Sequence, residues 1–153
     1  MSPVASPAIR FVAAVPQFTI PDVVRTAEYY RDVLGFSIAG YHGSPAAFGI
    51  VQRDRVEVFF NRAECAEPRT GRDTEGYDAY FHIVGVDALA KDLAARGAEI
   101  LEGPVDRFYY QRELVVRDCN GLVLAFAEDT SRFANDNAQA SKDPSQPNCK
   151  PDP

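Results

Sequence analysis

The sequence of 153 residues contains no tryptophan, one methionine, two histidines and three cysteines without C-x-x-C spacing. An odd number of cysteines without that spacing argues against a disulfide framework and a structural zinc site, so we interpret Cys65, Cys119 and Cys149 as free thiols. No apolar run approaches the roughly 18 residues needed to cross a bilayer. The first ten residues lack the basic stretch and apolar segment of a signal peptide. We therefore expect a cytoplasmic protein without a membrane partner.

The charge balance disfavours other classes of partner. The 16 Lys and Arg residues and 22 Asp and Glu residues give a formal net charge of −6 and a pI near 4.9. Because phosphate contacts require clustered basic side chains, and the sequence has no such cluster, we expect no nucleic-acid partner. The sequence also lacks a nucleophile elbow and a phosphate-binding glycine loop. Acidic character suits a cationic small molecule, but it is equally an ordinary means of keeping a protein in solution.

The chain contains a weak internal repeat. Residues 20–38 align with residues 83–100, and both segments end an apolar pattern in a glycine, Gly35 or Gly97. Apolar residues three and four positions apart predict an amphipathic helix, and a glycine can take the left-handed conformation that ends one. The apolar helix positions are Val23, Ala27, Tyr30 and Leu34 in the first segment and Val86, Leu89 and Leu93 in the second.

Short strand patterns, separated by Gly, Pro or charged turns, precede and follow each predicted helix. The order is β-α-β-β-β, twice, and a duplicated module of this kind predicts an α+β fold with two similar half-sheets in one domain. The predicted strands are residues 15–20, 36–41, 46–51 and 56–60 in the first module and 78–84, 98–101, 112–117 and 122–127 in the second.

The ends and the middle of the chain are polar and lack periodicity, so we expect a single folded domain with disordered termini. The expected layout is a disordered N-terminus at 1–10, a domain over 11–130 with modules at about 12–61 and 77–129 joined by a linker at 62–76, and a disordered tail at 131–153.

Alternation along two predicted strands separates an apolar side from a mixed one. The apolar side is expected beneath the helices. The opposite side combines carboxylate, imidazole, phenol and phenyl groups, which is typical of a solvated sheet face but also of a pocket wall with a few placed polar groups. The residues of this mixed side are Glu57, Phe59, Asp78, Tyr80 and His82.

A β-hairpin is predicted over residues 109–129. A D-C-N-G turn separates two apolar runs, and Asn-Gly tolerates the positive φ angles that tight turns require. The second strand of the hairpin alternates between bulky residues that suit a core and small residues that suit the wall of a cavity. The bulky set is Leu122, Leu124 and Phe126, and the small set is Val123, Ala125 and Ala127.

This sequence resembles the vicinal oxygen chelate superfamily, which includes glyoxalase I, bleomycin-resistance proteins and extradiol dioxygenases. The resemblance spans about residues 12–129 and is carried by V-P-Q-F-T-I-P-D-V-V-R-T-A-E-Y-Y-R-D-V-L-G-F, V-D-A-L-A-K-D-L-A-A-R-G-A-E-I and Y-Y-Q-R-E-L-V-V-R-D-C-N-G-L-V-L-A-F, in this order. It implies paired βαβββ modules whose mixed sheet curls into a cup, with the helices on the outer face.

The resemblance also implies where a metal would bind. Metal-dependent members of the superfamily place His or Glu ligands on four strands, at positions that correspond here to Val15, Glu57, Asp78 and Ala125. Valine and alanine have no donor atoms, and two carboxylates with water would form a weak, magnesium-like site. We therefore expect no metal and no cofactor. The alternative is a metal-dependent lyase, isomerase or dioxygenase that uses Glu57, Asp78 and His82.

Residues Tyr109, Arg112 and Glu113 resemble the Tyr-x-x-Arg-Glu stretch of bleomycin-resistance-like members. Glycine is common in those proteins at the position of Tyr110, and proline at that of Cys119. The resemblance implies a non-enzymatic, antibiotic-resistance-like protein that sequesters a cationic or aromatic ligand, because carboxylates supply opposite charge and aromatic rings stack. Alternatively, Arg112 and Glu113 hold the hairpin together.

The sequence thus predicts a small-molecule-binding protein without catalytic or metal-binding residues. The resemblance further implies a homodimer, since small members of this superfamily usually build the cup from two chains. A module that binds another protein is a third hypothesis, without specific support in the sequence. The predicted ligand-binding residues are Glu57, Phe59, Asp78, Tyr80, His82, Tyr109 and Arg112.

Overall fold

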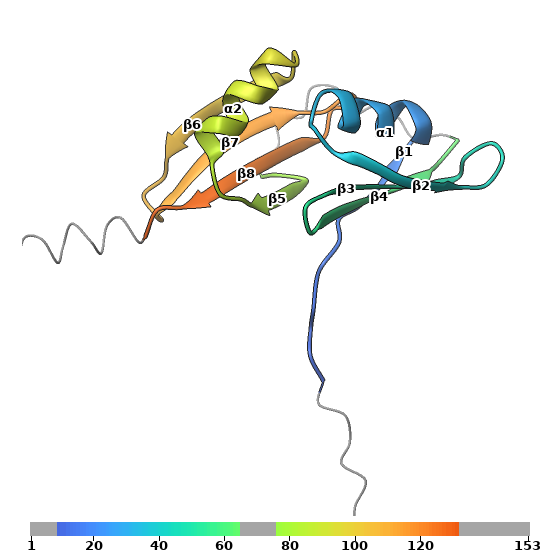
Figure 1. Cartoon of the computed structure of the whole chain (residues 1–153), viewed down its shortest axis with the longest axis horizontal. Helices are drawn as coiled ribbons and strands as arrows, with labels where there is room; N and C mark the ends of the chain where they lie inside the picture. The colour runs from blue at the N-terminus through green and yellow to red at the C-terminus, as the bar shows by residue number, and fades with distance from the viewer. Residues whose placement is uncertain (1–8, 65–75, 132–153) are drawn as a thin grey trace, which may run out of the picture. The chain divides into compact units, whose positions relative to one another are not determined.

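A computed structural model describes residues 9–64 and 76–131 of the chain (Figure 1). The chain divides into two compact units, one of residues 1–31 and 35–67 and the other of residues 32–34 and 68–153. Cys65 and Cys149 lie outside the described residues. So do most of the expected linker and most of the tail that was expected to be disordered. Cys119 forms no disulfide bond among the described residues. No helix in the described ranges is long and apolar enough to cross a membrane.

The first unit contains one βαβββ module. Its strands form a sheet in the order β1-β4-β3-β2, in which β1 runs parallel to β4 and the other neighbours are antiparallel. The elements are β1 (Gln17–Ile20), α1 (Val23–Asp32), β2 (Ser37–His42), β3 (Phe48–Arg53) and β4 (Val56–Arg62).

Helix α1 begins and ends where local chemistry satisfies its backbone. A side-chain oxygen of Asp22 accepts the Arg25 amide at 2.9 Å, which is an N-terminal cap. At the other end Gly35 has a φ of 74°, and the Phe36 amide donates to the Tyr30 carbonyl at 2.9 Å. This left-handed glycine ends the helix as the sequence predicts.

The predicted apolar face of α1 packs on the sheet of the first unit. The Tyr30 ring lies edge-on to Phe60 of β4 at 4.9 Å, and both residues are fully buried. A Cβ atom on Gly49 of β3 would lie only 2.6 Å from Val23 Cγ1, so this glycine permits the close approach of helix and strand. The predicted burial of Val58 and Phe60 on this side of β4 is confirmed.

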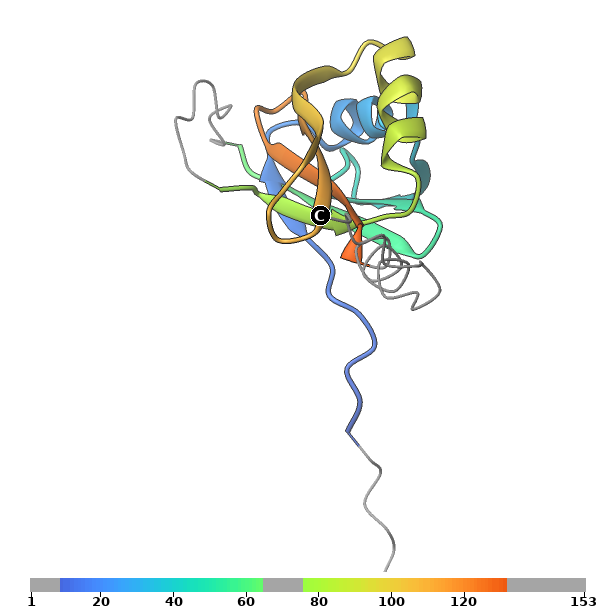
Figure 2. The same cartoon turned by 90° about the vertical axis from the view of Figure 1, so that its left-hand side faces the viewer.

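The second unit repeats the arrangement. Its sheet has the order β5-β8-β7-β6, with β5 parallel to β8, and α2 lies on one face of this sheet (Figures 1 and 2). The elements are β5 (Ala79–His82), α2 (Val86–Ala95), β6 (Glu99–Asp106), β7 (Gln111–Arg117) and β8 (Val123–Asp129). The predicted α+β fold of two βαβββ modules is confirmed.

The N-terminus of α2 is held by side chains from the sheet. Gly85 precedes the helix at a φ of 87° and has no side chain to cap it. Glu128 instead accepts the Val86 amide at 3.0 Å, and Arg112 donates to both oxygens of Asp87 at 2.9 and 3.0 Å. A carboxylate at a helix N-terminus also complements the helix dipole. The sheet therefore fixes where α2 starts.

The alternation predicted for the second unit is confirmed. Phe81 of β5 stacks on Phe126 of β8 at 5.2 Å on the α2 side, where Leu122 and Leu124 are also buried. Ala125 and Ala127 point to the other face of β8 and are fully buried as well. That other face of the sheet carries the candidate site described below.

The predicted hairpin turn between β7 and β8 is present at residues 118–121. Only Gly121 has a positive φ, at 79°, whereas Asn120 does not. The Gly121 amide donates to the Asp118 carbonyl, and the Asp118 amide donates to the Leu122 carbonyl. This is a three-residue loop with a left-handed residue in its last position. A side-chain oxygen of Asp118 accepts the amides of Asn120 and Leu122, which favours this loop.

The turn between β6 and β7 has the same hydrogen bonds at equivalent positions. The Tyr110 amide donates to the Arg107 carbonyl at 3.1 Å, and the Arg107 amide donates to the Gln111 carbonyl at 2.7 Å. Tyr110 therefore occupies the position of Gly121, with a φ of 59°. Only glycine takes this left-handed conformation without steric cost, so the β6–β7 turn is strained at Tyr110.

Strand β6 runs to Asp106 and is longer than predicted, because Gly103 and Pro104 form an irregularity within the strand and do not end it. The register with β7 shifts between Glu102 and Val105. Gly103 has a φ of 94°, and a Cβ atom there would collide with the carbonyl oxygen of Glu113. Glycine at this position thus allows β6 to pass close to the backbone of Glu113.

We predict that Gly103→Ala destabilises the protein by about 3 kcal/mol, because it adds an unfavourable φ and a backbone collision. Gly97→Ala is the matched control: Gly97 has a φ of 80°, but no atom lies within 4 Å of the added Cβ. The control should cost only about 1 kcal/mol. Urea unfolding of both variants tests this, and equal losses would contradict the close approach of β6 and β7.

Candidate functional site

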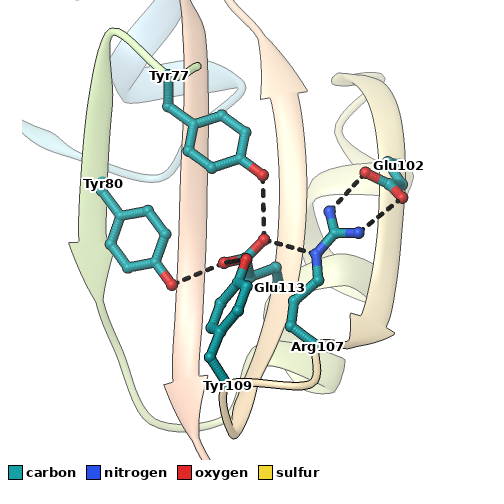
Figure 3. Close-up of polar contacts among 6 residues, drawn as sticks. All are labelled: Tyr77, Tyr80, Glu102, Arg107, Tyr109 and Glu113. Atoms are coloured by element: carbon teal, nitrogen blue, oxygen red, sulfur yellow. Dashed lines mark hydrogen bonds and ion pairs between the residues drawn. The ribbon is translucent and has the colours of Figure 1, made fainter. Parts of the chain in front are cut away.

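A buried carboxylate in the second unit gathers polar side chains from three segments of the chain. Glu113 of β7 is fully buried. Its Oε1 accepts the hydroxyls of Tyr80 and Tyr109 at 2.7 and 2.8 Å, and its Oε2 accepts the Tyr77 hydroxyl at 3.0 Å and Arg107 Nε at 2.8 Å (Figure 3). Four donors match the four lone-pair sites of a carboxylate. We call these five residues the tyrosine–Glu113 cluster.

Small residues on β8 make room for this cluster. Tyr80 on β5 and Glu113 on β7 are both neighbours of β8, where Tyr80 pairs with Ala125 and Glu113 pairs with Ala127. Two strand spacings separate β5 from β7, about 9.6 Å, so the phenol must reach across β8 to the carboxylate. Larger side chains in place of the alanines would occupy the path of the Tyr80 ring.

The β6–β7 turn supplies two further members of the cluster. Tyr109 lies in the turn, directly before the strained Tyr110, and Arg107 begins it. Arg107 also donates to both oxygens of Glu102 on β6, at 2.6 and 3.1 Å. The guanidinium therefore bridges two carboxylates, one buried and one exposed, as Figure 3 shows. This fixes the turn, and with it the Tyr109 phenol, against the strand that carries Glu113.

Two opposing effects act on the pKa of Glu113. Burial by itself raises the pKa of this carboxyl, but hydrogen bonds from the arginine and the three tyrosines outweigh burial and hold the pKa below its usual range. Glu113 is therefore ionised at neutral pH. Burial and the hydrogen bond to Glu113 raise the pKa values of Tyr77 and Tyr80, and the hydrogen bond followed by burial raises that of Tyr109. These phenols keep their protons.

The structure brings some of the predicted ligand-binding residues together. Tyr80 and Tyr109 share one oxygen of Glu113, and the His82 ring lies edge-on to the Tyr80 ring at 5.3 Å. Asp78 is on the same side of β5, but its Oδ2 accepts the Val123 amide at 2.9 Å and joins β5 to β8. Its carboxylate thus has a structural role at the start of the strand.

Arg112 is not brought together with Tyr80. It points to the α2 side of β7, where it donates to Asp87 and to Asp106. Alternation along β7 puts Glu113 on the opposite face, so Arg112 and Glu113 act on different sides of the sheet. The structural alternative had Arg112 hold the hairpin, whereas its contacts join β7 to α2 and β6. The hydrogen bonds to Asp87 and Asp106 also raise the pKa of Arg112.

Glu57 and Phe59 belong to the other unit. Both lie on β4, on the side opposite the buried Val58 and Phe60. The Phe59 ring lies edge-on to the Phe48 ring of β3 at 5.4 Å. Phe48 in turn lies 5.9 Å from the ring of His42. The first sheet thus carries a row of aromatic rings beside a carboxylate, as the strand alternation predicts.

The sequence reasoning missed the centre of the cluster. Glu113 was expected either to belong to the Tyr-x-x-Arg-Glu stretch of bleomycin-resistance-like proteins or to hold the hairpin, and Tyr77 and Arg107 were given no role. The signal was weak, because the four donors lie up to 36 residues from Glu113 and meet it only when the register of β5, β8 and β7 is known. The available clue was a glutamate directly before the apolar run L-V-V, with Tyr109 and Tyr110 shortly before it.

The donor set of the described residues does not fit a catalytic transition metal. Within 9–64 and 76–131 no group of three or more His, Cys, Asp or Glu side chains is placed to hold a metal ion. Ala125 has no donor atom and pairs with Tyr80, and Asp78 bonds a backbone amide. The oxygens of Glu113 are already engaged by four donors.

Comparison with known proteins identifies the family. A model of the Glyoxalase/Bleomycin resistance protein/Dioxygenase superfamily matches residues 12–126, which is most of the chain. The chain belongs to this superfamily. The family expected from the three sequence stretches is confirmed, and so is the paired βαβββ architecture that it implies.

Relatives of this superfamily member come from several bacteria. The virulence protein STM3117 of Salmonella typhimurium is 25% identical over 115 residues, which are 72% of this chain and 78% of that protein. TioX from Micromonospora sp. ML1 has a similar fold, with a TM-score of 0.62, 20% identity and coverage of 78% of this chain and 99% of TioX.

A further structure is that of the bleomycin-binding protein from bleomycin-producing Streptomyces verticillus, complexed with copper(II)-bleomycin. Its TM-score is 0.58 at 24% identity, and the match covers 78% of this chain and 97% of that protein. At this level of identity the likeness shows the shared fold.

We predict that Glu113→Gln destabilises the protein by about 3 kcal/mol at pH 7, because it removes a buried charge whose four donors then lack an ionised acceptor. Because the folded-state pKa of Glu113 is lowered, its contribution is complete above the ordinary glutamate value of about 4.3 and is lost as pH falls below it. Between pH 5 and pH 3, Glu113→Gln should therefore lose less stability than the unmodified protein. The difference should be on the order of the contribution of this one carboxylate.

Glu102→Gln is the matched control, since Glu102 shares Arg107 but its side chain is 51% exposed. It should cost less than about 1 kcal/mol. Chemical unfolding at several pH values measures both variants. If Glu113→Gln were as mild as the control and kept the full acid sensitivity, Glu113 would not be the buried charge on which the cluster rests.

We also predict that Tyr110→Gly stabilises the protein by about 1 kcal/mol, because it removes the cost of a left-handed tyrosine. Phe108→Gly is the control in the same turn, since Phe108 is exposed and does not have a positive φ. That substitution should be neutral or destabilising, because it only makes the unfolded chain more flexible. Thermal unfolding distinguishes the two, and a destabilised Tyr110→Gly would show that the turn is unstrained.

Proposed function

We propose that this chain is a non-catalytic binding protein that sequesters a cationic or aromatic small molecule on the face of the second sheet that carries the tyrosine–Glu113 cluster. The observation that carries the proposal is the fixed position of three phenol rings around one buried carboxylate. Tyr77, Tyr80 and Tyr109 donate to Glu113, yet they remain 39%, 38% and 45% exposed. Aromatic surface that is both immobile and accessible is suited to ligand binding.

Preorganisation supports this function. An exposed tyrosine that is free to rotate loses side-chain entropy when a ligand orders it, and that loss weakens binding. Here the hydroxyls of all three tyrosines are already held by Glu113, at 2.7 to 3.0 Å. The hydrogen bonds of the cluster therefore order the rings before a ligand binds. Binding then loses less side-chain entropy, and contacts with the rings contribute more fully to affinity.

Charge and aromatic character support the ligand class. The site rests on an ionised carboxylate, and the rings of Tyr77 and Tyr80 lie 5.9 Å apart with His82 beside Tyr80. Aromatic faces attract cations through their quadrupole and stack with flat ligands. The chain as a whole has a net charge of −6, which favours the approach of a cation at moderate salt.

The superfamily gives independent support. The Streptomyces verticillus protein with this fold is a bleomycin-binding protein. By analogy we propose an antibiotic-resistance-like role for this chain. Fold-level likeness raises the expectation of ligand binding but does not identify the ligand. A homodimeric assembly in the cytoplasm remains part of this proposal, and sedimentation of the purified chain tests the dimer. Glu57 and Phe59 lie on the first unit and stay separate predictions of ligand-binding residues.

We predict that at least one compound in a panel of flat aromatic molecules, cationic, neutral and anionic, raises the melting temperature of the protein. A ligand at about one hundred times its Kd should stabilise the folded state by about 2.7 kcal/mol. Tyr80→Ala should abolish that stabilisation. Tyr41→Ala is the matched control, because Tyr41 is also 38% exposed but lies on β2 of the first unit.

Thermal shift identifies the binding compound and calorimetry gives its affinity in each variant. The proposal fails if no compound of the panel binds. The choice of site fails if a ligand binds equally well to the Tyr80→Ala and Tyr41→Ala proteins.

A further inference from the structure

We propose that the exposed side of the tyrosine–Glu113 cluster, together with Gln111 Oε1, presents hydrogen-bond acceptors to a ligand, because the three phenols have no proton left to donate. Such a surface selects ligands that carry N–H donors on a cationic group: a primary or secondary ammonium, an amidinium or a guanidinium, attached to an aromatic ring. This inference rests on the proposed function and adds the chemical group that the site recognises.

The phenol protons of the cluster are all donated to Glu113. An ionised carboxylate can only accept hydrogen bonds, so each of the three phenols must donate its single proton to Glu113. A phenol whose proton is committed in this way retains only the lone pairs of its oxygen. Tyr77, Tyr80 and Tyr109 can therefore meet a ligand only as acceptors. A tyrosine that turned to donate to a ligand would leave Glu113 short of a donor inside the protein.

Gln111 adds a fourth acceptor to the same face. It lies two residues before Glu113 on β7, so the two side chains share a side of the sheet. Its side-chain oxygen Oε1 is buried and has no hydrogen-bond partner among the described residues. Buried polar atoms are nearly always paired, and an unpaired one calls for a partner from outside the chain. An N–H donor of a ligand would satisfy it.

The local charge favours a cationic ligand. Glu102, Arg107 and Glu113 form a chain of two ion pairs, at 2.6 and 2.8 Å, with two negative groups and one positive. These three groups thus keep one net negative charge, and all three nitrogens of Arg107 donate within the chain of ion pairs. A cation is attracted to this charge, whereas a carboxylate or phosphate would meet like charge and three phenols that have no proton left to donate.

Two cations that share a benzyl group distinguish hydrogen bonding to the acceptors from cation–π attraction. Benzylamine and benzyltrimethylammonium have the same ring and the same charge, but only the first has N–H groups. We expect benzylamine to bind the full chain about tenfold more tightly, the factor of one or two hydrogen bonds to a charged donor. Benzoate, with the opposite charge, should show no binding. Chemical-shift titration by NMR is suited to the weak affinities of such small probes.

Tyr80→Phe tests the role of the oxygen, because it keeps the ring and removes the acceptor. It should weaken benzylamine binding several-fold and leave benzyltrimethylammonium unchanged. Gln111→Met is a second variant that removes an acceptor without touching any partner of Glu113, and it should act in the same selective way. Circular dichroism and the dispersion of the NMR spectrum establish that each variant is folded.

The outcomes separate this inference from the proposed function. Equal affinities for benzylamine and benzyltrimethylammonium would overturn the acceptor surface while ligand binding stands. Equal losses of affinity for both compounds in Tyr80→Phe and Gln111→Met would do the same. Binding of benzoate in preference to benzylamine would overturn it too. Absence of binding by these probes and by the whole aromatic panel would remove the proposed function itself.

Discussion

The carboxylate of Glu113 is the constraint on which the second unit depends. A charged group without access to water is costly unless every lone pair is engaged, and here one guanidinium and three phenols engage them. The donors are Tyr77, two residues before β5, Tyr80 on β5 itself, and Arg107 and Tyr109 of the β6–β7 turn. None of these segments can shift without leaving the charge unpaired. The polar cluster therefore fixes the relative positions of elements that apolar packing alone would leave more freedom.

The backbone around Glu113 is adapted to hold it. Gly103 lets β6 approach the Glu113 carbonyl at a positive φ, and Tyr110 takes a left-handed conformation in a turn whose counterpart uses Gly121. Strain of this kind persists where the surrounding structure determines the conformation, and it concentrates at functional sites. Tyr110 lies between Tyr109 and Gln111, which are both part of the proposed acceptor surface. The strained residue thus lies between two of the proposed ligand-binding groups.

Much of the fold could be predicted from the sequence, because the physical signals were local. Helical apolar spacing and the glycines Gly35 and Gly97 marked both helices, and strand alternation separated buried from mixed faces. The predicted D-C-N-G turn joins β7 and β8, where Gly121 is left-handed and the Asp118 side chain accepts two loop amides. The predicted end of β6 was wrong, since Gly103 and Pro104 indicate a break where the strand continues through an irregularity.

The candidate site was less predictable, because it depends on register. Tyr80 and Tyr109 were expected to bind ligand, but their common partner became visible only when β5, β8 and β7 were placed side by side. Ala125 shows the difference most clearly. In the sequence it is a position without a metal-binding atom, whereas in the structure it is a small residue in the row that Tyr80 must cross. Either way Ala125 offers no metal ligand. The structure adds that the Tyr80 side chain crosses the sheet at this position.

The central claim is that Glu113 stays ionised although it is buried, because its hydrogen bonds outweigh the loss of water. A carbon-13 NMR titration of the side-chain carboxyl carbons, with the Glu113 signal assigned by comparison with Glu113→Gln, tests this directly. The account predicts a midpoint for Glu113 below the ordinary glutamate value of about 4.3. A midpoint above that value would mean that burial dominates and the carboxyl takes up a proton. In that case the phenols would not be committed as donors, and the acceptor surface would lose its basis.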